Sequence, residues 1–480
     1  MRGSKWFSLE EHRGVTFNLA YAIVAQGVSL ASSMLMSLVV PRMLGIEEYA
    51  YWQLFVLYSG YVGLALLGVH DGVFLRLGGT TVSKIDWTRI KTQFALVTGF
   101  QLLVCFAVLF ATCIPFIGDS RQIIFLFVVA DALIVNPSAF LFYVFRASNL
   151  PSIYSTASMV SGVAWVLALI VLTALDTERF VFYVLCYLAC QGISSLVGYL
   201  YAAQVLTCHF GSFRQGLRDI WGDFVAGIKV TAAYYAGSLV IGSCRMLIDW
   251  RWGIETFGRF SFSVSLVNFL LSFMAQVSMV IFPIVRRMGE ESQSRAYAII
   301  RSGLATVLPL IYIAYYPGCR LLSWWLPQYA DSLSYLGIML PICYFDCKVQ
   351  LLVNTYLKSL RKENALLLIN LGTLGISLLL CLFAIFVLSD VIFAATAIVI
   401  AIIFRSVVAE IYLNHHMSVG GRRLLISEIV LAAAFVASAY YASSPVLTIA
   451  AVLVFYLFNF GQIRCFVSLI ANRLSRSCKR

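Results

Sequence analysis

The sequence predicts an all-α protein that crosses a membrane about fourteen times. Hydrophobic residues occupy 61% of the 480 positions and charged residues only 12%, whereas a soluble protein has about 25% charged residues. The apolar residues form continuous runs of roughly 20 residues, which is long enough to cross a hydrocarbon core of about 30 Å. A membrane β-barrel would instead show alternating segments of about ten residues. Helices are therefore the expected spans, because they satisfy their own backbone hydrogen bonds.

Short connections join the apolar runs, so no soluble domain is expected. The first run follows a polar, weakly basic segment and is too long for a cleavable signal peptide, which predicts a retained first helix. The fourteen runs cover residues 15–40, 50–68, 93–115, 122–144, 156–175, 180–206, 224–247, 259–285, 299–319, 334–357, 366–388, 391–413, 426–442 and 445–470.

The distribution of basic residues predicts the orientation. If the N-terminus is cytoplasmic, most of the 34 lysines and arginines fall in inner segments, as the positive-inside rule requires, and both termini are then inside. Orientation and contact with membrane lipids account for the net charge of +12, so nucleic acid is not an expected partner. The twelve cysteines lack metal-ligand spacing and are interpreted as small buried hydrophobes. We expect no metal and no cofactor.

A short repeat indicates two related halves. Gly45–Trp52 (GIEEYAYW) returns as Gly253–Phe260 (GIETFGRF), and each copy lies between two apolar runs. Six predicted helices separate the copies, so the halves have the same orientation, as in transporters with parallel repeats. A weaker echo relates Phe145–Ser148 to Leu357–Leu360. The predicted organisation is two six-helix bundles, 1–206 and 207–413, followed by two extra helices and a basic tail, 414–480.

Several motifs resemble the polysaccharide-repeat (O-antigen type) flippases of the multidrug/oligosaccharidyl-lipid/polysaccharide exporter superfamily. The resemblance covers nearly the whole chain. Its motifs are Pro41-Arg42-x-Leu44-Gly45-x-x-x-Tyr49, Leu67-Gly68-Val69-x-Asp71-Gly72, Ile248-Asp249, Gly258, Phe282-Pro283 with Arg286, and the polar segment from Lys358 to Asn364.

The resemblance implies a V-shaped pair of bundles around a central cavity in the bacterial inner membrane. Its cargo would be an undecaprenyl-pyrophosphate-linked oligosaccharide for O-antigen, lipopolysaccharide, capsule or exopolysaccharide assembly. The implied protein is a transporter and not an enzyme. Coupling to H⁺ or Na⁺ and docking of polysaccharide-assembly proteins are left open.

Charged residues within the spans are the candidate functional residues, because such residues are costly in a membrane and usually face a cavity or a partner. Lys229, Arg245, Asp249 and Arg42 are the candidate cargo contacts. Lys229 could equally be a snorkelling lysine, and the i, i+4 spacing of Arg245 and Asp249 also suits a local ion pair. Asp131, Asp346 and Glu410 are the candidate ion-coupling carboxylates. The alternative for each is a structural contact between helices, with Arg405 as a neighbour of Glu410.

Two other functions stay open. A small-molecule, cation-coupled antiporter of the same superfamily would have the same helices. A membrane glycosyltransferase or polymerase could use the acidic pair Glu47 and Glu48. However, the loop that holds this pair is short, and only Glu47 has a counterpart in the second copy, Glu255. We therefore interpret the pair as part of a tight turn.

Overall fold

The computed structural model describes residues 15–80, 84–112, 119–148, 150–203, 207–286, 288–360, 362–417 and 419–464. Within these ranges the regular structure consists of α-helices with short 3₁₀ and π segments, and contains no strand. The predicted all-α class is confirmed. The chain divides into two compact units, Met1–Tyr235 and Ala236–Arg480, which are described one at a time.

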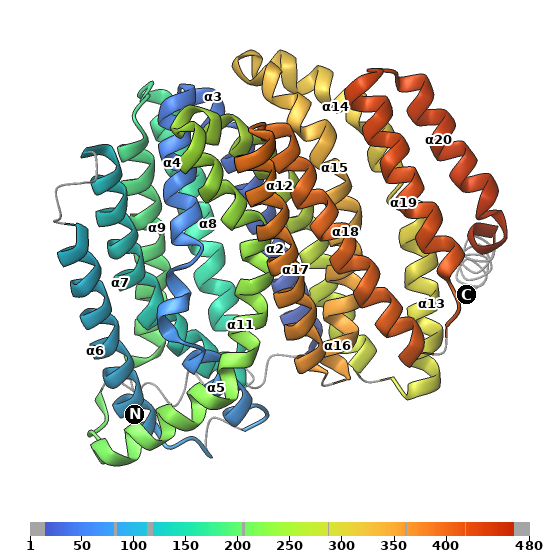
Figure 1. Ribbon diagram of the computed structural model, residues 1–480. Helices are drawn as coiled ribbons and strands as arrows, with labels where there is room; N and C mark the ends of the chain where they lie inside the picture. Colours follow the sequence, from blue (N-terminus) through green and yellow to red (C-terminus); the bar gives the residue numbers. More distant parts are fainter. Residues whose placement is uncertain are drawn as a thin grey trace. The chain divides into compact units, whose positions relative to one another are not determined.

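Unit 1 consists of long helices joined by short connections (Figure 1). Helix α8 packs against α2 and α9, while α7 packs against α4, α5, α6 and α9. In chain order the helices are α2 (Val15–Leu38), α3 (Val40–Met43), α4 (Ile46–Ser59), a 3₁₀ turn (Val62–Leu66), α5 (Val69–Leu77), α6 (Trp87–Thr112), α7 (Asp119–Ala147), α8 (Pro151–Ala174), α9 (Phe180–Tyr201) and the first part of α11 (Phe213–Trp252).

Unit 2 begins within α11 and is helical to the end of its described residues. Helix α15 is its centre, since α12, α14, α18 and α19 all pack against it. The helices are α12 (Ile254–Arg286), α13 (Glu290–Val307), α14 (Leu310–Trp325), a 3₁₀ turn (Pro327–Ser332), α15 (Leu333–Lys348), a π segment (Val349–Asn354), α16 (Thr355–Ser359), α17 (Glu363–Phe383), a π segment (Ala384–Leu388), α18 (Val391–His416), α19 (Arg422–Val436), a π segment (Ala437–Tyr441) and α20 (Pro445–Phe458).

Each of the fourteen predicted runs has a helical counterpart. Twelve helices in the described residues are long and apolar enough to cross a membrane, among them α13 and α14 as one span of 34 residues. A thirteenth candidate is the pair Ile46–Leu66 and Val69–Leu77, which bends by 57°. The last run is represented by α20, whose 14 residues are fewer than the roughly 20 of a full span; the predicted run itself continues to 470, outside the described residues. The 1–206, 207–413 and 414–480 division stays a prediction, and so does the V-shaped cavity.

The bend between α4 and α5 has a local backbone cause. Leu67 and Gly68 have φ angles of +50° and +83°, so two successive residues adopt the left-handed conformation and redirect the chain. Glycine takes this conformation without steric cost. The Leu67-Gly68 motif thus lies at the end of the second predicted run, 50–68, and the chain continues beyond it in a new direction as α5.

Candidate functional site

Each copy of the repeat leads into a helix, although the glycine backbones differ, with φ of −62° at Gly45 and +84° at Gly253. Gly45 precedes α4 and Gly253 precedes α12, and both helices start at an isoleucine followed by glutamate. The aromatic positions are also equivalent, because Tyr49, Trp52, Phe257 and Phe260 are all completely buried. The repeat therefore marks the start of two helices that are anchored by two aromatic side chains each.

The acidic pair of the first copy has structural partners. The Glu48 carboxylate accepts a hydrogen bond of 2.7 Å from the backbone N–H of Phe180, the first residue of α9. Glu47 accepts a hydrogen bond of 3.4 Å from the Tyr51 hydroxyl one turn later. A carboxylate at a helix N-terminus satisfies an otherwise unpaired N–H group and interacts favourably with the helix dipole. This agrees with the interpretation of the pair as part of a turn.

The Leu67–Gly72 motif also brings two helices into close contact. A Cβ atom on Gly72 would overlap the backbone of Asp223, and one on Gly227 would overlap the backbone of Gly68. Small residues four apart let helix backbones approach closely in a membrane. At the same crossing, the Thr231 hydroxyl donates a hydrogen bond of 2.5 Å to Asp71. The motif therefore fixes α5 against α11.

Two ion pairs hold the first turns of α11 against α5 and α6. Arg76 of α5 makes two hydrogen bonds, of 2.7 and 2.8 Å, to the buried carboxylate of Asp223. Arg89 of α6 binds Asp219 in the same way, at 3.0 and 2.6 Å. The acidic residues of this segment therefore point toward α5 and α6.

The opposite face of this segment is apolar and basic. Phe213, Leu217 and Trp221, spaced four residues apart, are 63%, 48% and 65% exposed. Arg214 and Arg218 are exposed as well. Residues four apart share a helix face, so an apolar stripe flanked by arginines faces outward, as expected for a helix in the interface of a membrane.

Asp131 is a buried carboxylate of unit 1. It lies in the middle of α7, only 3% exposed, and its Oδ1 atom has no hydrogen-bond partner among the described residues. Its polar neighbour is Ser59 at the end of α4. Further along α7, Asn136 donates a hydrogen bond of 2.9 Å to the carbonyl of Val62 in the broken span. Asp131 therefore lies beside the break and has one carboxylate oxygen without a hydrogen-bond partner in the described part of the chain.

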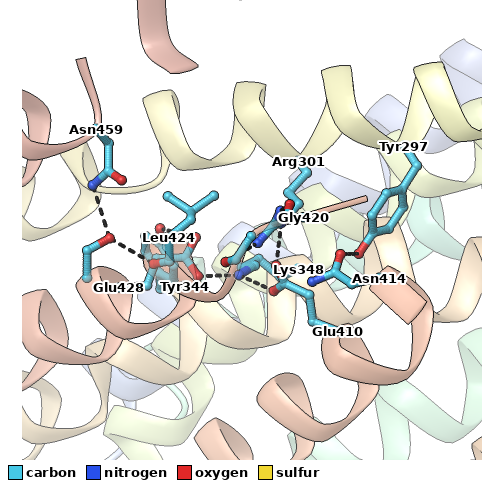
Figure 2. Close-up of polar contacts among 12 residues, drawn as sticks. Tyr297, Arg301, Tyr344, Lys348, Glu410, Asn414, Gly420, Leu424, Glu428 and Asn459 are labelled. Atoms are coloured by element: carbon cyan, nitrogen blue, oxygen red, sulfur yellow. Dashed lines mark hydrogen bonds and ion pairs between the residues drawn. The ribbon is translucent and has the colours of Figure 1, made fainter. Parts of the chain in front are cut away.

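Unit 2 contains a buried network of four charged residues, contributed by four helices (Figure 2). The ammonium group of Lys348, at the end of α15, lies 2.5 Å from a carboxylate oxygen of Glu410 on α18 and also binds Glu428 on α19. Arg301 of α13 binds the other oxygen of Glu410. The side chains of all four are at most 4% exposed.

Hydrogen bonds complete this network. Arg301 also donates to the carbonyl oxygens of Gly420 and Gly421, at 3.0 and 2.9 Å, in the connection between α18 and α19. The Tyr344 hydroxyl donates to Glu428 at 3.1 Å (Figure 2). Two cations and two carboxylates sum to zero charge, which is the condition under which buried charges are tolerated.

A second buried ion pair lies in the same unit. Arg405 of α18 binds Asp346 of α15, and both side chains are about nine-tenths buried. Arg405 also donates a hydrogen bond of 3.4 Å to the carbonyl of Gly237 on α11. The predicted neighbour of Arg405, Glu410, is instead bound to Arg301 and Lys348.

The structure places the predicted cargo contacts in different environments. Lys229 is exposed on α11, and Arg42 is exposed on α3. Arg245 and Asp249 are 6% and 5% exposed, respectively. The Arg245 guanidinium donates to the Ser261 hydroxyl at 3.1 Å and stacks over the Phe257 ring at 5.1 Å. Arg245 is therefore bound to the start of α12.

Sequence reasoning missed Arg301 and Glu428 as partners. Glu428 lies inside the predicted run 426–442, so the signal that singled out Asp131, a carboxylate within a span, also applied to it. Arg301 lies near the start of the predicted run 299–319, where an arginine at the end of a span is expected to face the membrane surface. The ion pairs of Asp219 and Asp223 had no signal in the sequence.

Comparison with known proteins gives matches at the level of structure. No protein-family model matches the chain, and no curated protein does. An inward-facing multidrug resistance MATE family transporter of the MOP superfamily aligns with a TM-score of 0.57 at 12% identity, over 82% of this chain and 94% of that chain. The lipid II flippase MurJ, in an inward closed conformation, aligns with a TM-score of 0.55 at 11% identity, over 94% of this chain and 99% of that chain.

A MOP superfamily transporter from Pyrococcus furiosus also aligns, with a TM-score of 0.52 at 12% identity, over 83% of this chain and 95% of that chain. These structural alignments establish a shared fold, but at sequence identities this low they do not identify the substrate. The chain is a multi-span membrane protein with the fold of the MOP-superfamily transporters.

Proposed function

We propose that the protein is a flippase that moves an undecaprenyl-pyrophosphate-linked oligosaccharide repeat unit across the bacterial inner membrane by alternating access. The pyrophosphate and sugars are too polar to enter hydrocarbon unaided, because burying unpaired polar and charged groups is costly. The translocated repeat unit would be used in O-antigen, capsule or exopolysaccharide assembly.

One observation carries the proposal: the last two helices are an integral part of unit 2. Glu428 of α19 is bound to Lys348 of α15, so α19 is held to the centre of the unit by a buried charge. The match to a lipid II flippase covers 94% of this chain, whereas the match to a MATE transporter covers 82%. The larger coverage by the lipid II flippase therefore supports a cargo with a lipid tail.

Among the candidate residues, we assign the cargo role to exposed cations and the coupling role to Asp131. Lys229 and Arg42 are exposed and could meet a pyrophosphate. Asp346 and Glu410 already neutralise cations, so freeing either carboxylate for an ion would leave a buried positive charge. Asp131 has no cation bound to it among the described residues, which favours it as the site of a proton or sodium ion.

Deleting the gene in its host tests the proposal. Surface polysaccharide should fall, and the lipid-linked repeat unit should accumulate on the cytoplasmic side of the membrane. Complementation with the wild-type gene should restore both. Unchanged surface polysaccharide, without accumulation of the lipid-linked repeat, would refute the proposed function.

A small-molecule antiporter is the second candidate, favoured by the TM-score of 0.57 to a MATE transporter and by the buried Asp131. Drug-susceptibility profiles of the deletion strain separate the two. The flippase proposal expects no change in resistance, whereas the antiporter requires sensitivity to its substrates. The polymerase alternative is disfavoured because Glu48 already holds the start of α9.

A further inference from the structure

An arginine at the end of α7 is held in place by aromatic rings. The Arg146 guanidinium carbon lies 5.4 Å from the ring centroids of both Tyr143 and Tyr154 and 6.0 Å from that of Phe74. Cation–π attraction therefore orients the guanidinium. The side chain is exposed, and it has no ion pair or hydrogen bond to another described residue. Its N–H donors are fixed in direction and available to a ligand.

The rings around this arginine are themselves accessible. Tyr154 is 43% exposed and Phe74 is 38% exposed. Tyr234 on α11, within electrostatic range of Tyr154, is 68% exposed. Three aromatic side chains from α5, α8 and α11 thus accompany one cation on the surface of unit 1.

A buried polar group lies behind the rings. His70 packs edge-on against Tyr143, with 4.6 Å between ring centroids. It is only 8% exposed, and its Nδ1 atom has no hydrogen-bond partner among the described residues. Its Nε2 atom lies 3.5 Å from the Asp71 carboxylate, which also accepts the Thr231 hydroxyl. A buried imidazole with one unpaired nitrogen therefore packs against Tyr143, one of the rings that hold Arg146.

We propose that Arg146, Phe74, Tyr143, Tyr154 and Tyr234 form a binding site for the phosphorylated sugar of the transported lipid. The planar guanidinium matches two phosphate oxygens at once. The negative faces of aromatic rings attract the weakly positive C–H groups on one face of a sugar ring. This inference rests on the proposed function and specifies where the first sugar and its phosphate bind.

Phosphate could also come from a membrane phospholipid, since arginine and tyrosine both occur at membrane interfaces. A phospholipid site would not depend on a sugar or on a pyrophosphate. The full-length protein should therefore be placed in phosphatidylcholine nanodiscs and offered three probes. These are undecaprenyl pyrophosphate, undecaprenyl-pyrophosphoryl-N-acetylglucosamine and phosphatidylglycerol, with bound lipid quantified by native mass spectrometry.

The variants are Arg146→Ala, Arg146→Lys and the double variant Tyr154→Ala/Tyr234→Ala. We expect Arg146→Ala to weaken binding of both pyrophosphate lipids about tenfold, equivalent to about 1.4 kcal/mol, and Arg146→Lys to weaken it less. The double variant should weaken only the lipid that carries the sugar. Arg214→Ala, which removes another exposed arginine of unit 1, is the matched control and should bind like the wild type.

If the wild type and Arg146→Ala bind the pyrophosphate lipids equally well, the proposed binding site is refuted. An equal loss of phosphatidylglycerol binding in Arg146→Ala would show a phospholipid anchor and also overturn it. If the double variant loses the sugar-free lipid as strongly, the sugar contact is wrong. Arg146→Lys retains the charge and so controls for folding. Failure of these binding results leaves the gene-deletion phenotype unaffected, so the site and the proposed function fail separately.

Discussion

Lys348 is the residue whose removal should be most damaging to unit 2. It binds two carboxylates, Glu410 and Glu428, in a network whose four side chains are at most 4% exposed. In Lys348→Met, Arg301 still neutralises Glu410, but the partner left to Glu428 among the described residues is the uncharged Tyr344 hydroxyl. Breaking a buried ion pair by removing one partner costs about 3–5 kcal/mol, because it leaves an uncompensated charge.

A second substitution should reverse most of this loss. Glu428→Gln alone leaves two cations for one carboxylate, so it should also be destabilising. The double variant Lys348→Met/Glu428→Gln retains only Arg301 and Glu410, a neutral pair, and replaces the other pair by uncharged groups of similar size. Replacement of a buried ion pair by neutral residues is often close to energetically neutral. We therefore expect the double variant to be more stable than either single variant.

Thermal unfolding of the purified full-length protein measures these effects. A loss of 3–5 kcal/mol lowers Tm by about 6–20 °C in a domain of 150–250 residues, at about 2–4 °C per kcal/mol. Lys362→Met, at an exposed lysine just before α17, is the control and should leave Tm almost unchanged. If the Tm losses of the two single variants simply add in the double variant, the charges are not coupled and the reasoning is wrong.

Further substitutions test other parts of the structure. Gly72→Leu should lower Tm strongly and Gly72→Ala less, because a Cβ there meets the backbone of Asp223 and overpacking costs about 1–3 kcal/mol. Glu47→Gln/Glu48→Gln should largely preserve polysaccharide export, since a glutamine can still accept the N–H group of α9; abolished export would revive the polymerase alternative. Asp131→Asn should remove the dependence of transport on a proton or sodium gradient in proteoliposomes, and unchanged dependence would exclude Asp131 as the coupling site. The fluorescence of Trp221, measured as the difference between the wild type and Trp221→Phe, should be quenched by brominated lipid. Quenching by aqueous iodide alone would place this part of α11 in water. Lys229→Ala should impair export more than Lys229→Arg, and wild-type export by both would remove Lys229 from the cargo path.

The helices could be predicted because their signal is local. An apolar run of roughly 20 residues is stable in lipid as a helix, so every predicted run has a helical counterpart. The repeat Gly45–Trp52 and Gly253–Phe260 could also be recognised, because a glycine followed by the start of a helix depends on neighbouring residues alone. The predicted run 50–68 ends at the bend, but the short helix α5 after it was not predicted, because its nine residues include His70, Asp71 and Arg76 and form no apolar run.

The partners of the charged residues could not be predicted from neighbouring residues in the sequence. Arg301 and Glu410 are 109 residues apart in sequence, and Lys348 and Glu428 are 80 apart. Their pairing depends on how α13, α15, α18 and α19 pack, which composition and spacing do not encode. The sequence could indicate that a charge within a span needs a partner, but not whether that partner is another side chain, an ion or the cargo.

The buried carboxylates differ in whether they bind a cation. In unit 2 the carboxylates of Asp346, Glu410 and Glu428 each bind a cation of the same unit, so substitutions there should lower stability first and transport only as a consequence. In unit 1, Asp223 likewise binds Arg76, but Asp131 has an oxygen without a hydrogen-bond partner among the described residues, and Arg146 contacts the aromatic rings of Phe74, Tyr143 and Tyr154. A charged group without an ion-pair partner contributes less to the fold and is available to an ion or a ligand. Substitutions at these two positions should therefore change transport while Tm stays close to that of the wild type, and a large Tm loss in Asp131→Asn or Arg146→Lys would contradict this assignment of roles.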